Sequence, residues 1–80
     1  MEYNVQDVIT LQDDKKYMVM SKAIEAGVSY MFLMNIDDDK DFKFCNLDEN
    51  KKLFEIKNQD KITEIAPLLY KNLLEEIEKI

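Results

Sequence analysis

Residues 28–36 carry the strongest hydrophobic pattern of the chain. Five apolar side chains alternate along this segment, and Met31 and Leu33 put apolar groups on the opposite face as well. Successive side chains of a strand point to opposite faces of a sheet, so a strand that is apolar on both faces is covered on both. We therefore expect residues 28–36 to form a central strand.

Four further segments have the composition of strands, and polar turns separate them. These segments are residues 5–11, 17–23, 42–47 and 53–57. The turns fall at residues 12–15, 25–27, 37–41 and 48–51, and Gly27 is the only glycine of the chain. Short strands joined in this way form hairpins, and a lone glycine in a turn indicates a positive φ angle.

The period changes from two to 3.6 near residue 60. One helical stripe then contains Ile62, Ile65, Ala66, Leu69, Leu73, Ile77 and Ile80. We expect a main helix from about residue 63 to 79, with Asp60 or Thr63 as the N-cap. Pro67 then lies in the first turn if Thr63 is the cap, and kinks the helix if Asp60 is.

Together these elements predict an α+β protein. The expected fold is a five-stranded antiparallel β-meander, strongly bent or closed into an SH3-like barrel, with one C-terminal amphipathic helix packed on it. An open sheet with the helix across it fits the pattern equally well. With 80 residues, the chain should form a single domain (1–80), with the meander at 5–57 and the helix at 60–79.

The charge of the chain narrows the classes of partner. Its formal net charge is −6, which repels nucleic-acid phosphates and anionic lipid surfaces. We expect no direct nucleic-acid binding and no membrane association. The longest apolar run is too short to cross a bilayer, and the N-terminus has no signal-peptide pattern. The single cysteine, Cys45, cannot form an internal disulfide, so a cytoplasmic, reducing location is expected.

Residues 37–41 hold the only concentrated chemistry. Asp37, Asp39 and Asp41 match the D-x-D-x-D start of a calcium loop, and they are the weak metal candidates. However, Phe42 stands where such a loop needs glycine, and Asp48 stands where a bidentate glutamate is usual. A solvated hairpin tip explains the acids more simply, so we expect no bound metal and no cofactor.

The sequence also argues against catalysis. It has no histidine, which excludes the usual Cys–His and Ser–His pairs, and it has no glycine-rich phosphate loop. Its acids lie in turns and on the helix exterior, where carboxylates stay ionised and solvated. We therefore predict that the protein is not an enzyme, with Cys45 a buried structural thiol.

Two functional hypotheses remain. The first is a protein-interaction module, a dimer or a complex with another protein, acting through an edge strand or an apolar face. Met18, Met20, Met31 and Met34 favour such a face, since methionine suits adaptable contacts. The alternative is an acidic inhibitor or nucleic-acid mimic from a mobile element, bound in a basic groove of a larger protein. The candidate partner-binding residues are Asp37, Asp38, Asp39, Asp41, Leu68, Leu74, Glu75, Glu76 and Glu78.

The order of motifs resembles one known family. The motifs are, in chain order, D-V-I-T-L, a turn rich in Asp and Lys, Y-M-V-M, V-S-Y-M-F-L-M after a glycine, an acidic tip, F-K-F-C and an acidic helix. In this order the chain resembles the small YrzB-like proteins. These acidic bacterial chains form domain-of-unknown-function family 1292. The family's first turn usually carries a glycine, where this chain has Gln12-Asp13-Asp14-Lys15-Lys16. The resemblance implies no activity and no site residues.

Overall fold

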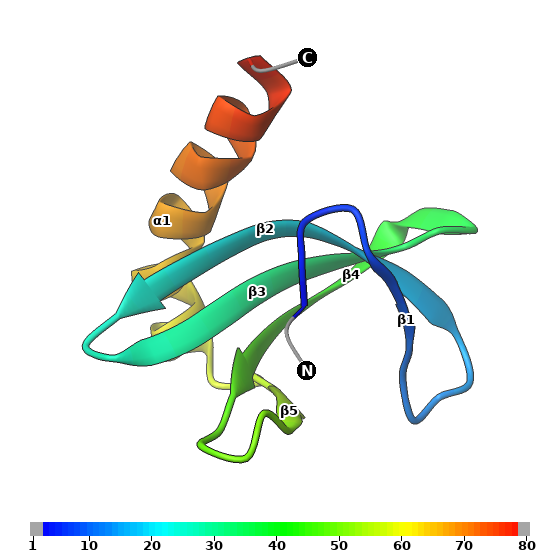
Figure 1. Ribbon diagram of the computed structural model, residues 1–80, viewed down its shortest axis with the longest axis horizontal. Helices are drawn as coiled ribbons and strands as arrows, with labels where there is room; N and C mark the ends of the chain where they lie inside the picture. Colours follow the sequence, from blue (N-terminus) through cyan, green and yellow to red (C-terminus); the bar gives the residue numbers. More distant parts are fainter. Residues whose placement is uncertain (1–2, 79–80) are drawn as a thin grey trace.

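The computed structural model describes residues 3–78, which form one curled sheet and one helix (Figure 1). The strands are β1 (Val8–Thr10), β2 (Lys16–Glu25), β3 (Val28–Asn35), β4 (Asp38–Leu47) and β5 (Leu53–Glu55), and the helix is α1 (Gln59–Glu78). Neighbouring strands pair antiparallel in the order β1-β2-β3-β4-β5. The predicted α+β meander is therefore confirmed, and the sheet is a half-barrel in which β1 and β5 do not pair within the described residues.

The inside of the curl holds the first hydrophobic core. β1 and β5 bend round toward one another below β2, β3 and β4 (Figure 1). Its buried residues are Tyr17, Val19, Met31, Leu33 and Cys45, and Tyr3, Ile9, Leu11 and Leu53 pack against them. The sheet thus covers its own inner face by curling.

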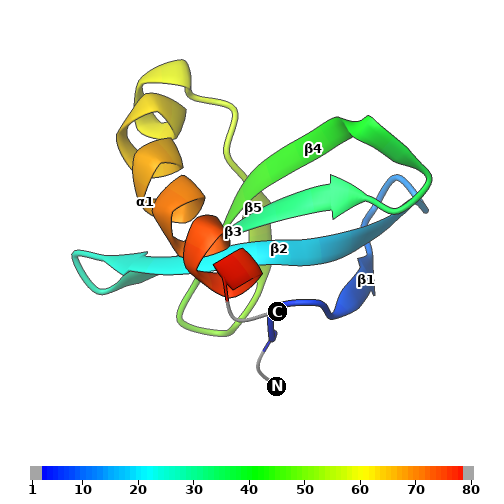
Figure 2. The same cartoon turned by 90° about the horizontal axis from the view of Figure 1, so that it is seen from above.

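The outer face of the sheet carries the helix and the second core. Figures 1 and 2 show α1 lying across the outer face, with its C-terminal turns rising away from the sheet. Ala23, Tyr30, Ile65 and Leu69 are buried between the sheet and the helix, with Val28, Phe32, Phe44 and Ile56 around them. β3 therefore contributes to both cores, which confirms the prediction of a central strand covered on both faces.

A bulge in β2 decides which side chains meet the helix. Val19 pairs with Leu33, but Ser21 pairs with Phe32, so Met20 has no partner in the register. A single inserted residue reverses the faces of all later side chains. As a result Tyr17 and Val19 point into the inner core, whereas Ser21 and Ala23 point outward under α1.

Small side chains under the helix allow close contact there. The buried Ser21 hydroxyl donates a hydrogen bond of 2.6 Å to the carbonyl oxygen of Leu69. The Asn72 amide donates another of 2.6 Å to the carbonyl oxygen of Lys22. These two bonds fix the position of α1 along β2, in addition to the apolar packing of Ile65 and Leu69.

The start of the helix corrects the predicted cap. The side-chain oxygen of Asn58 accepts hydrogen bonds from the backbone N–H groups of Asp60 (2.9 Å) and Lys61 (3.2 Å), so Asn58 is the N-cap. The prediction of Asp60 or Thr63 was wrong, because the chain leaving β5 enters the helix earlier than the apolar stripe indicates. The expected end at residue 79 lies outside the described residues.

Pro67 lies inside the helix, so of the two alternatives left open by the sequence the place in the first turn was wrong. A proline in a helix interior removes one backbone hydrogen bond. Here its ring is exposed, and the buried side chains Ile65 and Leu69 hold the helix on either side of it. Tertiary packing therefore outweighs the local cost.

The structure confirms the prediction for one turn and corrects it for another. Ala26 and Gly27 form the β2–β3 turn with φ angles of 52° and 78°, which confirms the positive φ predicted for Gly27. The β3–β4 turn is shorter than expected, because β4 already begins at Asp38. The predicted acidic tip at residues 37–41 therefore lies largely within a strand.

Removing the Leu69 side chain should strongly destabilise the protein. The Leu69→Ala substitution leaves a cavity in the outer core, for which a loss of about 2–5 kcal/mol is expected. Leu74→Ala, on the exposed side of the same helix, should cost about 1 kcal/mol or less. Urea unfolding followed by circular dichroism measures both losses. Equal losses would show that Leu69 does not anchor the helix.

Candidate functional site

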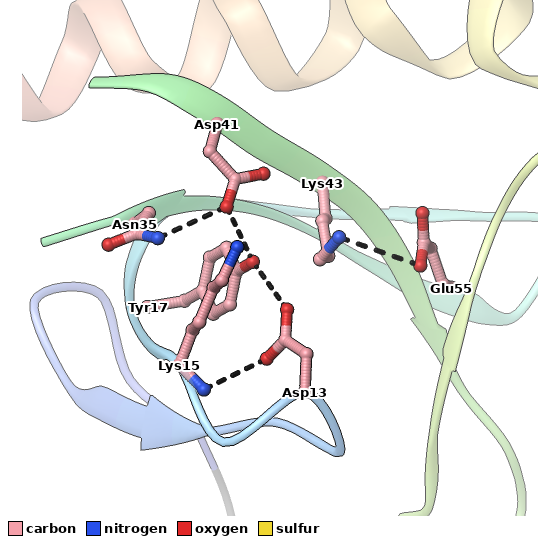
Figure 3. A network of polar contacts seen from close by, with 7 residues as sticks. All are labelled: Asp13, Lys15, Tyr17, Asn35, Asp41, Lys43 and Glu55. Atoms are coloured by element: carbon pink, nitrogen blue, oxygen red, sulfur yellow. Dashed lines mark hydrogen bonds and ion pairs between the residues drawn. The ribbon is translucent and has the colours of Figure 1, made fainter. Parts of the chain in front are cut away.

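A cluster of polar side chains surrounds the buried Tyr17 at one end of the sheet (Figure 3). The Tyr17 hydroxyl lies 2.8 Å from one oxygen of Asp13 and 2.8 Å from one oxygen of Asp41. The Asn35 amide donates to the same Asp41 oxygen at 3.1 Å. Because the phenol has one proton, it can donate to only one carboxylate at a time. We call Asp13, Tyr17, Asn35 and Asp41 the phenol cluster.

The phenol cluster does not provide a proton donor or acceptor tuned to neutral pH. Burial and hydrogen bonds with the two carboxylates raise the pKa of the Tyr17 hydroxyl. A hydrogen bond from the Lys15 backbone N–H lowers the pKa of Asp13, and the hydrogen bond from Asn35 lowers that of Asp41. The phenol therefore stays protonated and both carboxylates stay ionised near pH 7. General acid–base catalysis needs groups that change protonation near the working pH.

Lys43 completes the surroundings of the cluster. Its amine lies 5.5 Å from the centroid of the Tyr17 ring and 3.8 Å from a Glu55 oxygen. The cluster and Lys43 thereby connect the β1–β2 turn, β2, β3, β4 and β5. These contacts hold the β1–β2 turn and four strands together at one end of the half-barrel, which is a structural role.

The phenol cluster separates the three weak metal candidates from one another. Asp41 is turned toward Tyr17 and Asn35, while Asp37 and Asp39 are exposed at the β3–β4 turn. Within residues 3–78, no group of three or more His, Cys, Asp or Glu side chains is arranged to hold a metal ion. The D-x-D-x-D pattern does not converge because the Asp41 carboxylate is held by Tyr17 and Asn35.

Cys45 lies in the inner core with 2% of its surface exposed. Burial, with a smaller contribution from the charge of Glu55, raises the pKa of its thiol to about 11. Since the thiolate is the reactive form, this cysteine is a poor nucleophile at neutral pH.

An apolar surface lies on the outer face of the sheet, beyond the helix, where three half-buried methionines adjoin an exposed phenylalanine. Met18 pairs with Met34, and Met34 pairs with Phe42, so these three side chains form a row across β2, β3 and β4. The bulged Met20 lies beside them along β2. Phe42 is 51% exposed, and its ring centroid lies 5.6 Å from that of Phe32 in the outer core. We call Met18, Met20, Met34 and Phe42 the open face.

An open hollow of about 670 Å³ lies on this surface at the β3–β4 turn. Side chains of the open face and of the turn line this hollow. The lining residues are Met18, Met20, Met34, Asn35, Ile36, Asp37, Asp38, Asp39 and Lys40. Apolar groups thus meet carboxylates within one concave region.

One side of the helix extends this apolar surface. At 100° per residue, Tyr70, Leu73, Leu74 and Ile77 fall on one side of the buried line through Ile65 and Leu69, and Asn72 and Glu75 fall on the other. Leu69 accepts a hydrogen bond from Ser21, and Asn72 donates one to Lys22. Lys22 is one residue closer to the β2–β3 turn than Ser21, so the Asn72 side of the helix faces that turn. The apolar side of the helix therefore faces away from the β2–β3 turn. We call Tyr70, Leu73, Leu74 and Ile77 the helix flank.

The predicted partner-binding residues are divided between several surfaces. Leu74 belongs to the helix flank, whereas Leu68 lies on the opposite side of α1. Glu75 and Glu76 line a separate shallow hollow with Asn4 and Lys22, and Glu78 is exposed near the helix end. Three of the four methionines noted in the sequence are on the open face, while Met31 is in the inner core. Phe42 was not among the candidate residues.

Comparisons of the chain with protein-family models, with curated proteins and with solved structures give no match. The resemblance to the YrzB-like family accordingly stays a prediction. Among the described residues, no helix combines the length and the apolar character needed to cross a membrane.

The phenol cluster should make stability depend on acid pH. A carboxylate with a lowered pKa in the folded state contributes fully above its unfolded pKa of about 4, and loses that contribution as pH falls further. Asp41→Asn should therefore flatten the fall of the unfolding free energy between about pH 5 and pH 2. Tyr17→Phe should flatten it too, because the two carboxylates lose the one phenol hydrogen bond that they share. Urea unfolding across this pH range tests both, and unchanged slopes would contradict the assignment.

Cys45 should react with a thiol reagent only when the protein opens. We expect very slow modification by dithiobisnitrobenzoate near pH 8 in native buffer, and complete reaction within seconds in concentrated urea. The absorbance of the released thionitrobenzoate measures the rate. Immediate stoichiometric reaction in native buffer would refute the buried position of the thiol.

Proposed function

We propose that this protein is a non-enzymatic protein-interaction module. The observation that carries the proposal is the open face together with the helix flank, where aromatic and aliphatic side chains are exposed and the methionines beside them are half-buried. Tyr70 is 63% exposed, Ile77 55% and Phe42 51%. Contiguous apolar surface of this kind on a small domain marks a contact site for another macromolecule.

The chemistry of the side chains supports the same function. Methionine is unbranched and polarizable, so it adapts to differently shaped partners. Exposed aromatic side chains such as Phe42 and Tyr70 are the groups that contribute most to binding energy at interfaces. The phenol cluster, by contrast, has no group whose pKa suits acid–base catalysis near neutral pH. These features favour binding over catalysis.

The alternative of an acidic inhibitor or nucleic-acid mimic has weaker support. A mimic of that kind needs acids spread over one surface that a basic groove can contact. Here Asp41 is bonded to Tyr17 and Asn35, and the acids of the helix end belong to a different element from Asp37–Asp39. We therefore place the interaction module first.

A photoreactive amino acid at Phe42 should capture the partner. Benzoylphenylalanine at this position should give a discrete cross-linked product when a native lysate is irradiated, because the side chain lies within the proposed contact. The same group at Ile24 serves as the control. Ile24 is 76% exposed but belongs to neither the open face nor the helix flank. Mass spectrometry of the product gives the site of attachment.

Competition makes this experiment specific. An excess of unlabelled wild-type protein added to the lysate before irradiation should abolish the Phe42 product, and an excess of the Phe42→Ser variant should not. Products of equal yield from positions 42 and 24, or equal competition by both proteins, would refute the proposed contact surface.

A further inference from the structure

The hollow beside the β3–β4 turn has an unusual combination of linings. Met18, Met20, Met34 and Ile36 provide apolar side chains, and Asp37, Asp38 and Asp39 provide three carboxylates against the single cation Lys40. Ile36 is 47% exposed, so the apolar part is open to a ligand. A partner that fills this hollow meets apolar side chains and negative charge at the same place.

The three carboxylates are not neutralised by ion pairs within the protein. The ion pairs found among residues 3–78 are Lys43–Glu55 and Lys61–Glu64, and neither involves this turn. The side chain of Asp38 accepts a hydrogen bond from the Lys40 backbone N–H, which leaves its charge in place. Lys16 begins β2 at the same end of the sheet but is not part of the lining.

We propose that this hollow binds a basic amphipathic segment of a protein partner. An arginine or lysine side chain suits the site, since its aliphatic stem can pack on the methionines while its charged end meets the carboxylates. Apolar residues of the same segment would contact Phe42 and the helix flank. This inference rests on the proposed function and specifies the chemistry of its partner.

Charge also distinguishes this partner from a second copy of the chain. Two copies docked face to face about an axis through the hollow would bring their Asp37–Asp39 groups together. Juxtaposed like charges oppose association, whereas a basic segment gains attraction from the same acids and from the net charge of −6.

Two synthetic peptides of about 18 residues test the proposal, one with leucine and lysine on opposite helical faces and one with glutamate replacing every lysine. Isothermal titration of the full chain at low salt should show binding of the lysine peptide and none of the glutamate peptide. The triple variant Asp37→Asn, Asp38→Asn, Asp39→Asn should weaken binding about tenfold, and asparagine keeps the side-chain acceptor at position 38.

A second triple variant separates local charge from net charge. Glu49→Gln, Glu64→Gln and Glu75→Gln change the net charge by the same amount at exposed positions outside the hollow, and should weaken binding by about threefold or less. Phe42→Ser should weaken binding of the lysine peptide as well. Equal effects of the two triple variants, or binding of the glutamate peptide, would overturn the proposal.

The two proposals can fail separately. If the Phe42 cross-link forms and is competed by wild-type protein, but the lysine peptide does not bind, the interaction module stands and its basic partner is refuted. If position 42 gives no specific cross-link either, both proposals are refuted.

Discussion

The structure depends on covering both faces of β3. This strand is apolar on each side, with Met31 and Leu33 in the inner core and Tyr30 in the outer core. The inner face is covered by curling the sheet, which uses the short edge strands β1 and β5. Among residues 3–78, α1 is the one helix that packs on the outer face. It covers Ala23 and Tyr30 but leaves Phe42 exposed, so the open face is what this packing leaves over.

The bulge at Met20 determines where the helix lies. It turns the small side chains of Ser21 and Ala23 outward, so the backbone of α1 can approach closely enough to accept the Ser21 hydrogen bond. The larger Met18 and Met34 remain on the same face beyond the helix. A single irregularity of register thus separates the packed half of the outer face from its uncovered half.

The acids of the phenol cluster and the acids beside the open face have different surroundings. Asp13 and Asp41 share the hydrogen bond of the Tyr17 hydroxyl, which links the β1–β2 turn and β4 to β2. Asp37, Asp38 and Asp39 stay solvated beside the methionines. Charges next to exposed apolar surface oppose non-specific self-association, and they also restrict which partners can dock there. In the proposed interaction, the same three residues select a partner with basic side chains.

Much of the fold could be predicted from local pattern. The order of strands and helix and the double-sided burial of β3 follow from the spacing of apolar residues, and the positive φ of Gly27 follows from a lone glycine in a turn. Three features could not be predicted in this way: the N-cap at Asn58, the interior position of Pro67 and the length of the β3–β4 turn. These features depend on hydrogen bonds and packing whose energies exceed local propensity.

The sequence by itself determined the elements of this protein, because periods of 2 and 3.6 are properties of consecutive residues. Only the tertiary structure decided which surfaces remain uncovered. A pattern shows that Met18, Met20 and Met34 are apolar, but not that α1 packs over Ser21 and Ala23 and stops short of them. That outcome depends on strand register and on contacts between residues nearly fifty positions apart, such as Ser21 and Leu69. The candidate binding surface is therefore a property of the fold, and the residues that form it are brought together only there.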